Sequence, residues 1–245
     1  FQIINQLNPL VIVDENHHAR SELSLEMLEN FNPCFVLDLT ATPKKESNII
    51  SYVDAVQLKT EHMVKLPVIV YNRDSQSEVL IDTIDLRNKL EEIADAEYAK
   101  TGKYIRPIAL FQAQPKGKED ATTFEKLRDK LVDAGIPAEQ IAIRTADVNE
   151  LKNTDLMSPS CPIRYIITVN ALKEGWDCPF AYILASLANK TSQVDVEQIL
   201  GRILRLPHTS QHTQSALNMS YVLTSSNDFN NTCLLYTSDA ADDMQ

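Results

Sequence analysis

The chain has no C-x-x-C pair among its four cysteines, Cys34, Cys161, Cys178 and Cys233. This spacing argues against a zinc site and favours reduced thiols in a cytoplasmic protein. The sequence also has no apolar run of about 18 residues, so no transmembrane helix or membrane partner is expected. Its first residues lack the basic region of a signal peptide.

Basic residues are also scarce, since 23 Lys and Arg face 34 Asp and Glu and give a net charge of -11. Such a balance argues against a broad, non-specific nucleic-acid surface, because binding of that kind needs many cations near the phosphates. A local groove remains open as an alternative. Its candidate cations are scattered over the second half of the chain: Arg144, Arg164, Lys173, Lys190, Arg202 and Arg205.

Both ends of the sequence suggest a piece of a longer protein. The start has neither Met nor a helix cap, and residues 233–243 resemble the translation of a sequencing adapter. We therefore expect residues 233–245 to be a non-native tail. Without its three aspartates the acid count falls from 34 to 31, and against 23 Lys and Arg the net charge becomes -8.

Short apolar, β-branched runs alternate with helical patterns along the chain. This alternation predicts an α/β fold with parallel sheets covered by helices on both faces. The expected strands are Leu10–Val13, Cys34–Leu39, Val68–Tyr71, Ile105–Gln114, Gln140–Arg144, Arg164–Val169, Tyr182–Leu187 and Met219–Leu223. The expected helices are Ala19–Phe31, Ser77–Lys100 and Asp120–Ala134, the last two ended by Gly102 and Gly135. The polar segment 145–161 is expected to be a mobile loop.

The first two strands, both expected to be buried, end in candidate functional residues. Asp14-Glu15-Asn16-His17 follows the first, where one carboxylate can hold Mg²⁺ and the other can orient or deprotonate a water. An Asp that caps a helix after a plain turn is the alternative. Thr40-Ala41-Thr42-Pro43 follows the second, and its hydroxyls can bond the neighbouring acidic turn.

Two further features lie in the second half. Gly175-Trp176-Asp177 follows a strand, where Gly175 permits a tight turn and Asp177 can accept from a sugar hydroxyl or from an arginine. Trp176 is expected in the core. The stretch 198–205 reads Q-x-x-G-R-x-x-R, which predicts one helix with Arg202 and Arg205 on one face and apolar side chains on the other. Gly201 would leave room for a close ligand approach.

These four features, D-E-x-H, T-A-T-P, G-W-D and Q-x-x-G-R-x-x-R, occur in the order found in superfamily 2 helicases and translocases. Together they resemble that superfamily from Leu10 to about Thr224. Within it, Leu-Thr-Ala-Thr-Pro and Glu-Gly-Trp-Asp-Cys-Pro look most like the Res subunit of type III restriction enzymes and its DEAD/DEAH-box relatives.

The resemblance implies two RecA-like P-loop NTPase domains with ATP between them, an ATP-dependent helicase or translocase acting on DNA, and a modification methyltransferase as a possible partner. It assigns Mg²⁺ to Asp14 and, through water, to Glu15, which also activates the attacking water. His17 would couple the site to the other domain, and Thr40 and Thr42 would link hydrolysis to nucleic-acid movement. Gly175, Asp177 and Gln198 would lie at the nucleotide, with Arg202 and Arg205 as arginine fingers.

The expected domains are 1–66, the trailing part of the ATP-binding domain, and 67–232, a complete second domain. The chain departs from the family because it contains no G-x-x-x-x-G-K-[ST] loop and no nuclease domain. It is therefore not expected to hydrolyse ATP alone. Two alternatives stay open: a DNA or RNA helicase without a nuclease, and a helicase-like scaffold that binds nucleic acid without turnover.

Overall fold

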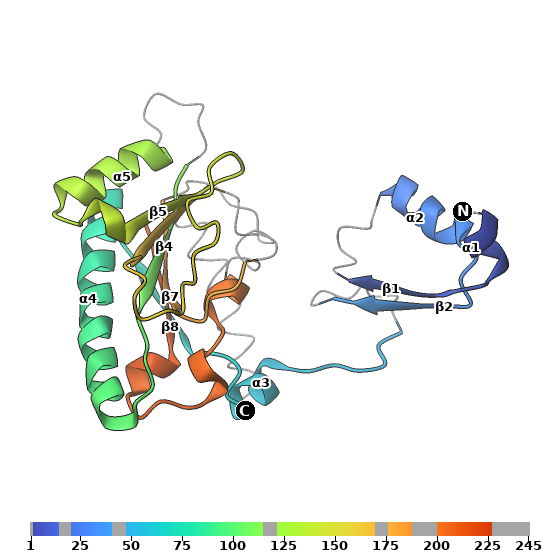
Figure 1. Cartoon of the computed structure of the whole chain (residues 1–245), viewed down its shortest axis with the longest axis horizontal. Helices are drawn as coiled ribbons and strands as arrows, with labels where there is room; N and C mark the ends of the chain where they lie inside the picture. Colours follow the sequence, from blue (N-terminus) through green and yellow to red (C-terminus); the bar gives the residue numbers. More distant parts are fainter. Residues whose placement is uncertain are drawn as a thin grey trace. The chain divides into compact units, whose positions relative to one another are not determined.

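The computed structural model divides the chain into two compact units, residues 1–52 and residues 53–245 (Figure 1). It describes residues 2–14, 21–40, 48–114, 122–169, 176–187 and 200–226. The division lies between Tyr52 and Val53, ahead of the boundary expected at Leu66. Residues 53–66 fall with the second unit because Met63 and Lys65 are hydrogen-bonded to the segment 204–206.

The small unit contains a parallel pair of strands, with helices drawn on one side of the pair in Figure 1. Its elements are α1 (Gln2–Gln6), β1 (Leu10–Asp14), α2 (Glu22–Asn30) and β2 (Phe35–Leu39). Ser21 caps α2 by accepting from the Ser24 N–H. Both expected strands form, with Leu10 opposite Phe35 and Asp14 opposite Leu39.

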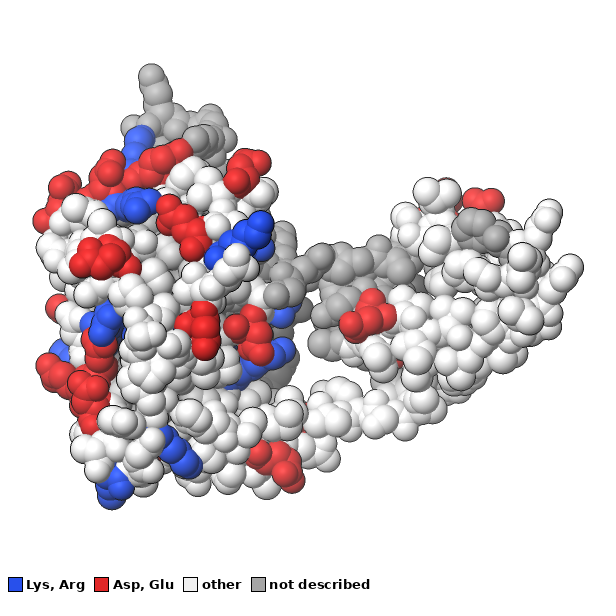
Figure 2. Space-filling view, viewed as in Figure 1, with Lys and Arg blue, Asp and Glu red and all other residues white. Residues whose placement is uncertain are grey.

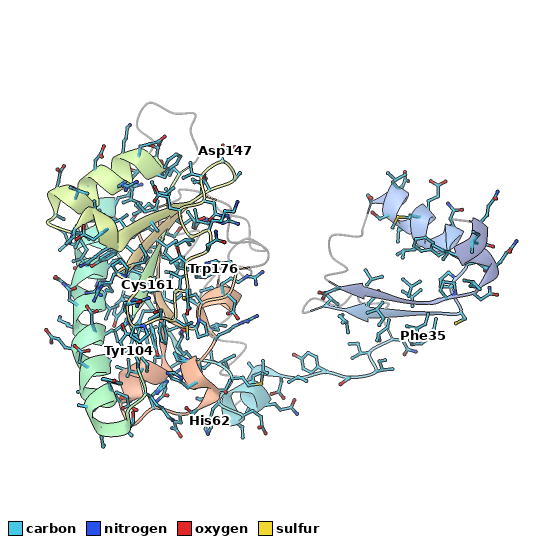
Figure 3. The ribbon with its side chains drawn as sticks, viewed as in Figure 1. Phe35, His62, Tyr104, Asp147, Cys161 and Trp176 are labelled. Carbon is cyan, nitrogen blue, oxygen red and sulfur yellow. The ribbon has the colours of Figure 1, made fainter. Side chains whose placement is uncertain are left out.

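The expectation that these two strands are buried is wrong for the described structure. Leu10 and Ile12 are 58% and 59% exposed, and Phe35, labelled in Figure 3, is 49% exposed. Val11 and Val13, which alternate with them, are half-buried. A parallel strand is buried only where both faces are covered and strands lie on both sides, whereas this sheet has two strands among the described residues.

The larger unit is built on a six-stranded parallel sheet in the order β3-β8-β7-β4-β6-β5. Its strands are β3 (Val68–Asn72), β4 (Ile108–Gln112), β5 (Ile141–Arg144), β6 (Tyr165–Thr168), β7 (Ala181–Ser186) and β8 (Ser220–Thr224). All residues of β4, β6, β7 and β8 are buried. The α/β fold with a parallel sheet is therefore confirmed.

Helices cover this sheet where the sequence pattern places them. α4 (Gln76–Thr101) packs on β4, β7 and β8, and α5 (Phe124–Asp133) packs on β6 (Figure 1). Ser75 and Thr123 cap their first turns, and Gly102 and Gly135 end them with φ of 71° and 87°, which glycine adopts without strain. Among the described residues, no helix has the length and apolar character of a membrane span.

Two short helices were not expected from the sequence, α1 at the start of the small unit and a second helix over residues 55–60. α3 (Ala55–Thr60) begins with a capping box, in which Asp54 accepts from the Gln57 N–H at 2.6 Å and the Gln57 side chain accepts from the Asp54 N–H. The remaining elements are the 3₁₀ turns η2 (Ala138–Gln140), η3 (Pro207–Thr209) and η4 (Ser215–Asn218). The Asp-x-x-Gln spacing is the sequence signal that could have revealed α3.

The segment expected to be a mobile loop is held by a buried arginine. Arg106 is 1% exposed and donates to the carbonyl oxygens of Leu156, Ser158 and Ile163 at 2.5 to 2.9 Å. These bonds tie the loop between β5 and β6 to the start of β4. The chain there is anchored because a buried guanidinium needs several acceptors.

Candidate functional site

The described part of the acidic turn lies beside the described part of the T-A-T-P motif. Asp14 is the last residue of β1 and stands opposite Leu39, so Thr40 follows directly on the neighbouring strand. Adjacent strands are about 4.8 Å apart. Asp14 is exposed and Thr40 is half-buried at the carboxyl edge of the pair, which is where parallel α/β sheets bind ligands. Glu15, His17 and Thr42 lie outside the described residues.

The arginine motif differs from its predicted geometry. Residues 200–203 are helical, but Arg205 forms an antiparallel bridge with Val64. The Lys65 N–H donates to the Leu204 carbonyl, and the Leu206 N–H donates to the Met63 carbonyl. This pairing ends the helix at Ile203. The two arginines therefore do not share a helix face, and a main-chain ladder instead of a helical turn sets the position of Arg205.

The apolar side of the motif packs as predicted. Leu200 and Ile203 are 5% and 0% exposed and belong to the core of the larger unit. Ile199 and Gln198 lie outside the described residues, as does Gly175. A Cβ built on Gly201 would have no atom of the described residues within 4 Å. Packing within the described part of the chain therefore does not require glycine at this position.

The structure joins the G-W-D turn to the arginine motif. Arg205 Nη1 donates to Asp177 Oδ2 at 2.5 Å, and the two side chains are 51% and 52% exposed. Arg202 Nη1 donates to the Trp176 carbonyl at 3.1 Å. Of the two acceptor roles open to Asp177, the one toward an arginine is the role seen here. Two stretches separated by 28 positions thus form one cluster of charged groups.

The core position expected for Trp176 is confirmed. Its side chain is 9% exposed and lies within the larger unit (Figure 3). The next residue but one, Cys178, is fully buried, and burial raises the pKa of its thiol to about 11. Cys34, Cys161 and Cys178 are free thiols. Among the described residues, no group of three or more His, Cys, Asp or Glu side chains converges on a metal position.

The scattered arginines do not line one groove. Arg144 ends β5, whereas Arg164 precedes β6, and because these strands are parallel the two residues lie at opposite edges of the sheet. Arg164 is paired with Glu91 at 2.8 Å. On the face seen in Figure 2, the described cations and carboxylates are interspersed without one large basic area. Lys173 and Lys190 lie outside the described residues.

Sequence reasoning missed a row of polar side chains across the carboxyl edge of the large sheet. Its members stand opposite one another in register at the last strand positions: Asn72, Thr224, Ser186, Gln112, Thr168 and Arg144. Ser186 Oγ donates to Gln112 Oε1 at 2.9 Å, and the Gln112 carbonyl accepts from the Leu187 N–H. The signal was a polar residue at the end of each apolar run. Thr224 Oγ1 also accepts from the Ser226 N–H at 3.0 Å, in the chain that follows β8.

Comparison with known proteins gives one family match. Residues 2–45 match the family described as "Type III restriction enzyme, res subunit". This segment contains the acidic turn and the T-A-T-P motif. No curated protein matches the sequence.

Solved structures match over nearly the whole chain. One is a fragment of a putative HsdR subunit of a type I restriction enzyme from Vibrio vulnificus, with a TM-score of 0.57, 18% identity, and coverage of 94% of this chain and 47% of that one. A Dbp5 variant from S. cerevisiae, bound to RNA and ADP BeF3, matches with a TM-score of 0.54 and 12% identity, and the match covers 95% of this chain and 57% of that one. The type ISP restriction-modification enzyme LlaBIII, bound to DNA, matches with a TM-score of 0.53 and 16% identity, and the match covers 95% of this chain and 20% of that one.

The chain has a parallel α/β fold similar to that of these structures. Residues 2–45 are similar to the Res-subunit family, and the sheets resemble those of the RecA-like fold. The chain spans 47%, 57% and 20% of the lengths of these three structures. At identities of 12% to 18%, this likeness shows the fold alone.

Proposed function

We propose that this chain is part of an ATP-driven DNA helicase or translocase, the Res subunit of a type III restriction enzyme. The observation that carries the proposal is the Arg205–Asp177 ion pair, which joins the two motifs that the family resemblance assigns to the nucleotide. The match of residues 2–45 to the Res family supports the choice of subunit. Both cluster residues are half-exposed, so a ligand can reach them.

In this proposal the small unit supplies the carboxylate chemistry. Asp14 is an exposed hard oxygen ligand at the carboxyl edge of β1, which suits Mg²⁺. Bound Mg²⁺ would neutralise charge on the phosphate oxygens. Glu15 would contact the metal through water and take the proton of the attacking water, and His17 would couple the site to the second domain. Thr40 and Thr42 would link ATP hydrolysis to movement of the nucleic acid.

The larger unit supplies the cations. Arg205 now donates to Asp177. With nucleotide bound, Asp177 and Gly175 would contact the sugar, while Gln198, Arg202 and Arg205 would face the phosphates. A guanidinium carries a planar fork of donors suited to phosphate oxygens, and it stabilises charge that develops in phosphoryl transfer. The exchange of one anionic partner for another keeps Arg205 charged and paired throughout.

DNA is the proposed nucleic acid, and a modification methyltransferase is the proposed partner subunit, because both follow from the Res match. Among the similar structures LlaBIII is bound to DNA, whereas Dbp5 is bound to RNA. An RNA or repair helicase without a nuclease is therefore the second candidate. A scaffold without turnover is disfavoured because the charges at Asp14, Arg202 and Arg205 are all present.

Glu15→Gln in the full-length protein tests the proposal. Gln keeps the shape of the side chain but cannot accept the proton, so ATP binding should persist while turnover is largely abolished. The measurement is ATPase activity with DNA and with RNA as stimulating polymer, next to nucleotide binding by equilibrium titration. An ATPase rate within a few-fold of wild type would reject the role of Glu15. Stimulation by RNA alone would favour the second candidate.

A further inference from the structure

The segment that leads into β3 contains a lysine buried against neutral groups. Lys65 is 0% exposed, and its Nζ donates to the carbonyl oxygens of Pro179 and Ala181 at 2.8 and 2.7 Å. The same nitrogen lies 4.0 Å from the centre of the Tyr182 ring. No carboxylate of the described residues forms an ion pair with Lys65. Burial lowers the pKa of Lys65 well below its usual value, and the Cys178 thiol opposes this.

A charge-bearing side chain in such a place costs stability unless its hydrogen bonds are all made. An apolar residue of the same length would fill the space without that cost. The position of Lys65 therefore calls for a reason other than stability. Its contacts supply one, because they reach two separate stretches of chain at once.

The side chain holds one of these stretches. Pro179 and Ala181 follow Asp177 by two and four positions, at the start of β7. The main chain holds the other, since the Lys65 N–H donates to the Leu204 carbonyl, next to Arg205. Ser220 Oγ completes the junction by contacting the carbonyls of Lys65 and Ile203 at 3.3 and 3.2 Å. Lys65 thus lies between the chain of Asp177 and the chain of Arg205.

We propose that Lys65 is a positioning residue that fixes the Asp177 turn and the Arg205 ladder against each other, and so sets the approach of the Arg205 guanidinium to its anionic partner. Lys65 touches no ligand in this role. The inference rests on the proposed function for its effect on turnover. Its structural part, the coupling of the two stretches, stands on the contacts alone.

Lys65→Met is the informative change, because Met keeps the length and apolar stem but donates no hydrogen bond. Arg106→Met is the matched control. Arg106 is also about fully buried and donates to carbonyls, but its hydrogen bonds go to Tyr104 and to residues 156–163 and not to either stretch. A misplacement of about 1 Å can lower a rate by about 100-fold. We expect kcat of the nucleic-acid-stimulated ATPase of the full-length protein to fall about 10- to 100-fold in Lys65→Met and to stay near wild type in Arg106→Met.

A double-mutant cycle separates positioning from a general loss of structure. If Lys65 acts through Arg205, then Lys65→Met should change kcat by less than about twofold in an Arg205→Lys background. An equal loss in both backgrounds, or an equal loss in Arg106→Met, overturns the proposal. If Lys65→Met does not fold, Ser220→Ala takes its place, with the same direction and a smaller effect.

Hydrogen exchange on this chain tests the coupling independently of any activity. Lys65→Met should speed amide exchange in both 176–183 and 204–206, whereas Arg106→Met should not. If Arg205→Lys leaves ATPase unchanged, the proposed function fails, and the exchange result still decides the role of Lys65. Unchanged exchange in both segments would rule out the junction.

Discussion

The two units treat the same kind of strand in different ways. Ile12 in β1 is 59% exposed, whereas Ile183 in β7 is 0% exposed, although both lie in apolar runs that end in a polar residue. In the larger unit, β7 has a strand on each side and a helix packed on it. Among the described residues, β1 pairs only with β2. An apolar run therefore predicts a strand, and its neighbours decide whether that strand is buried.

The candidate residues follow the same contrast. Asp14 is the last residue of β1 in a two-stranded sheet. Asp177 and Arg205 are hydrogen-bonded to each other, and main-chain hydrogen bonds of the larger unit hold the residues on either side of Arg205. The larger unit thus orders its site through its own fold. If that ordering matters, substitutions at these residues should change rate and stability to different extents in the two units.

The largest expected effect is on turnover. Arg205→Lys keeps the charge but loses the planar fork, and arginine fingers are worth about 10³-fold or more in rate in phosphoryl transfer. Arg205 is 51% exposed, so the change should cost within about 0.5 kcal/mol of stability. The measurement is ATPase turnover of the full-length protein with the melting temperature as control, and Arg202→Lys is tested in parallel. Normal turnover in both variants would leave the arginines as structural or solvated groups.

The second effect is on stability and addresses the contrast between the units directly. Ile183→Ala should cost about 2–5 kcal/mol of unfolding free energy, because it leaves a cavity in a packed core. Ile12→Ala should cost within about 0.5 kcal/mol, because its side chain is largely exposed. Chemical denaturation of this chain with both variants provides the comparison. A cost for Ile12→Ala close to that for Ile183→Ala would show that β1 is covered in solution.

Several parts of this structure could be predicted from the sequence, and for identifiable reasons. The strands of the large sheet and the end of α4 at Gly102 follow from local pattern and from backbone freedom. The end of the arginine helix at Ile203 could not be predicted, because a segment about 140 positions earlier pairs with it. The pairing of Asp177 with Arg205 was one of two open alternatives, since spacing alone does not choose an acceptor's partner.

A smaller effect should appear in the pH dependence of stability. The folded pKa of Lys65 is lowered, so the unfolded chain binds this proton more tightly than the folded chain. Lys65 should therefore make unfolding free energy rise as pH increases from its folded pKa toward about 10.4, the usual value. Cys178 acts in the opposite direction above its usual pKa, because burial raises its folded pKa to about 11.

The difference between wild type and Lys65→Met cancels the contributions of groups that Lys65 does not influence, while the pKa of Cys178, which Lys65 lowers, also changes in the variant. In denaturant melts of this chain at a series of alkaline pH values, the unfolding free energy of wild type should increase relative to that of the variant as pH rises. A difference that stays constant across this range would show that Lys65 titrates at its ordinary pKa, and that its amine is less buried than the contacts indicate.

The smallest expected effect on the fold comes from Gly201→Ala. This substitution tests whether a ligand occupies the open space beside Gly201. Alanine favours a helix over glycine by about 1 kcal/mol, and no described atom lies within 4 Å of the new Cβ. The melting temperature should therefore stay the same or rise slightly.

If a nucleotide or nucleic-acid backbone comes close to Gly201 in the working enzyme, KM for that ligand should rise while the stability does not fall. We expect this combination in the full-length protein, since Gly201 precedes Arg202 in the motif assigned to the phosphates. Unchanged KM values for ATP and DNA would place the ligand elsewhere along this motif, because a methyl group in a tight approach cannot be accommodated without moving one of the partners.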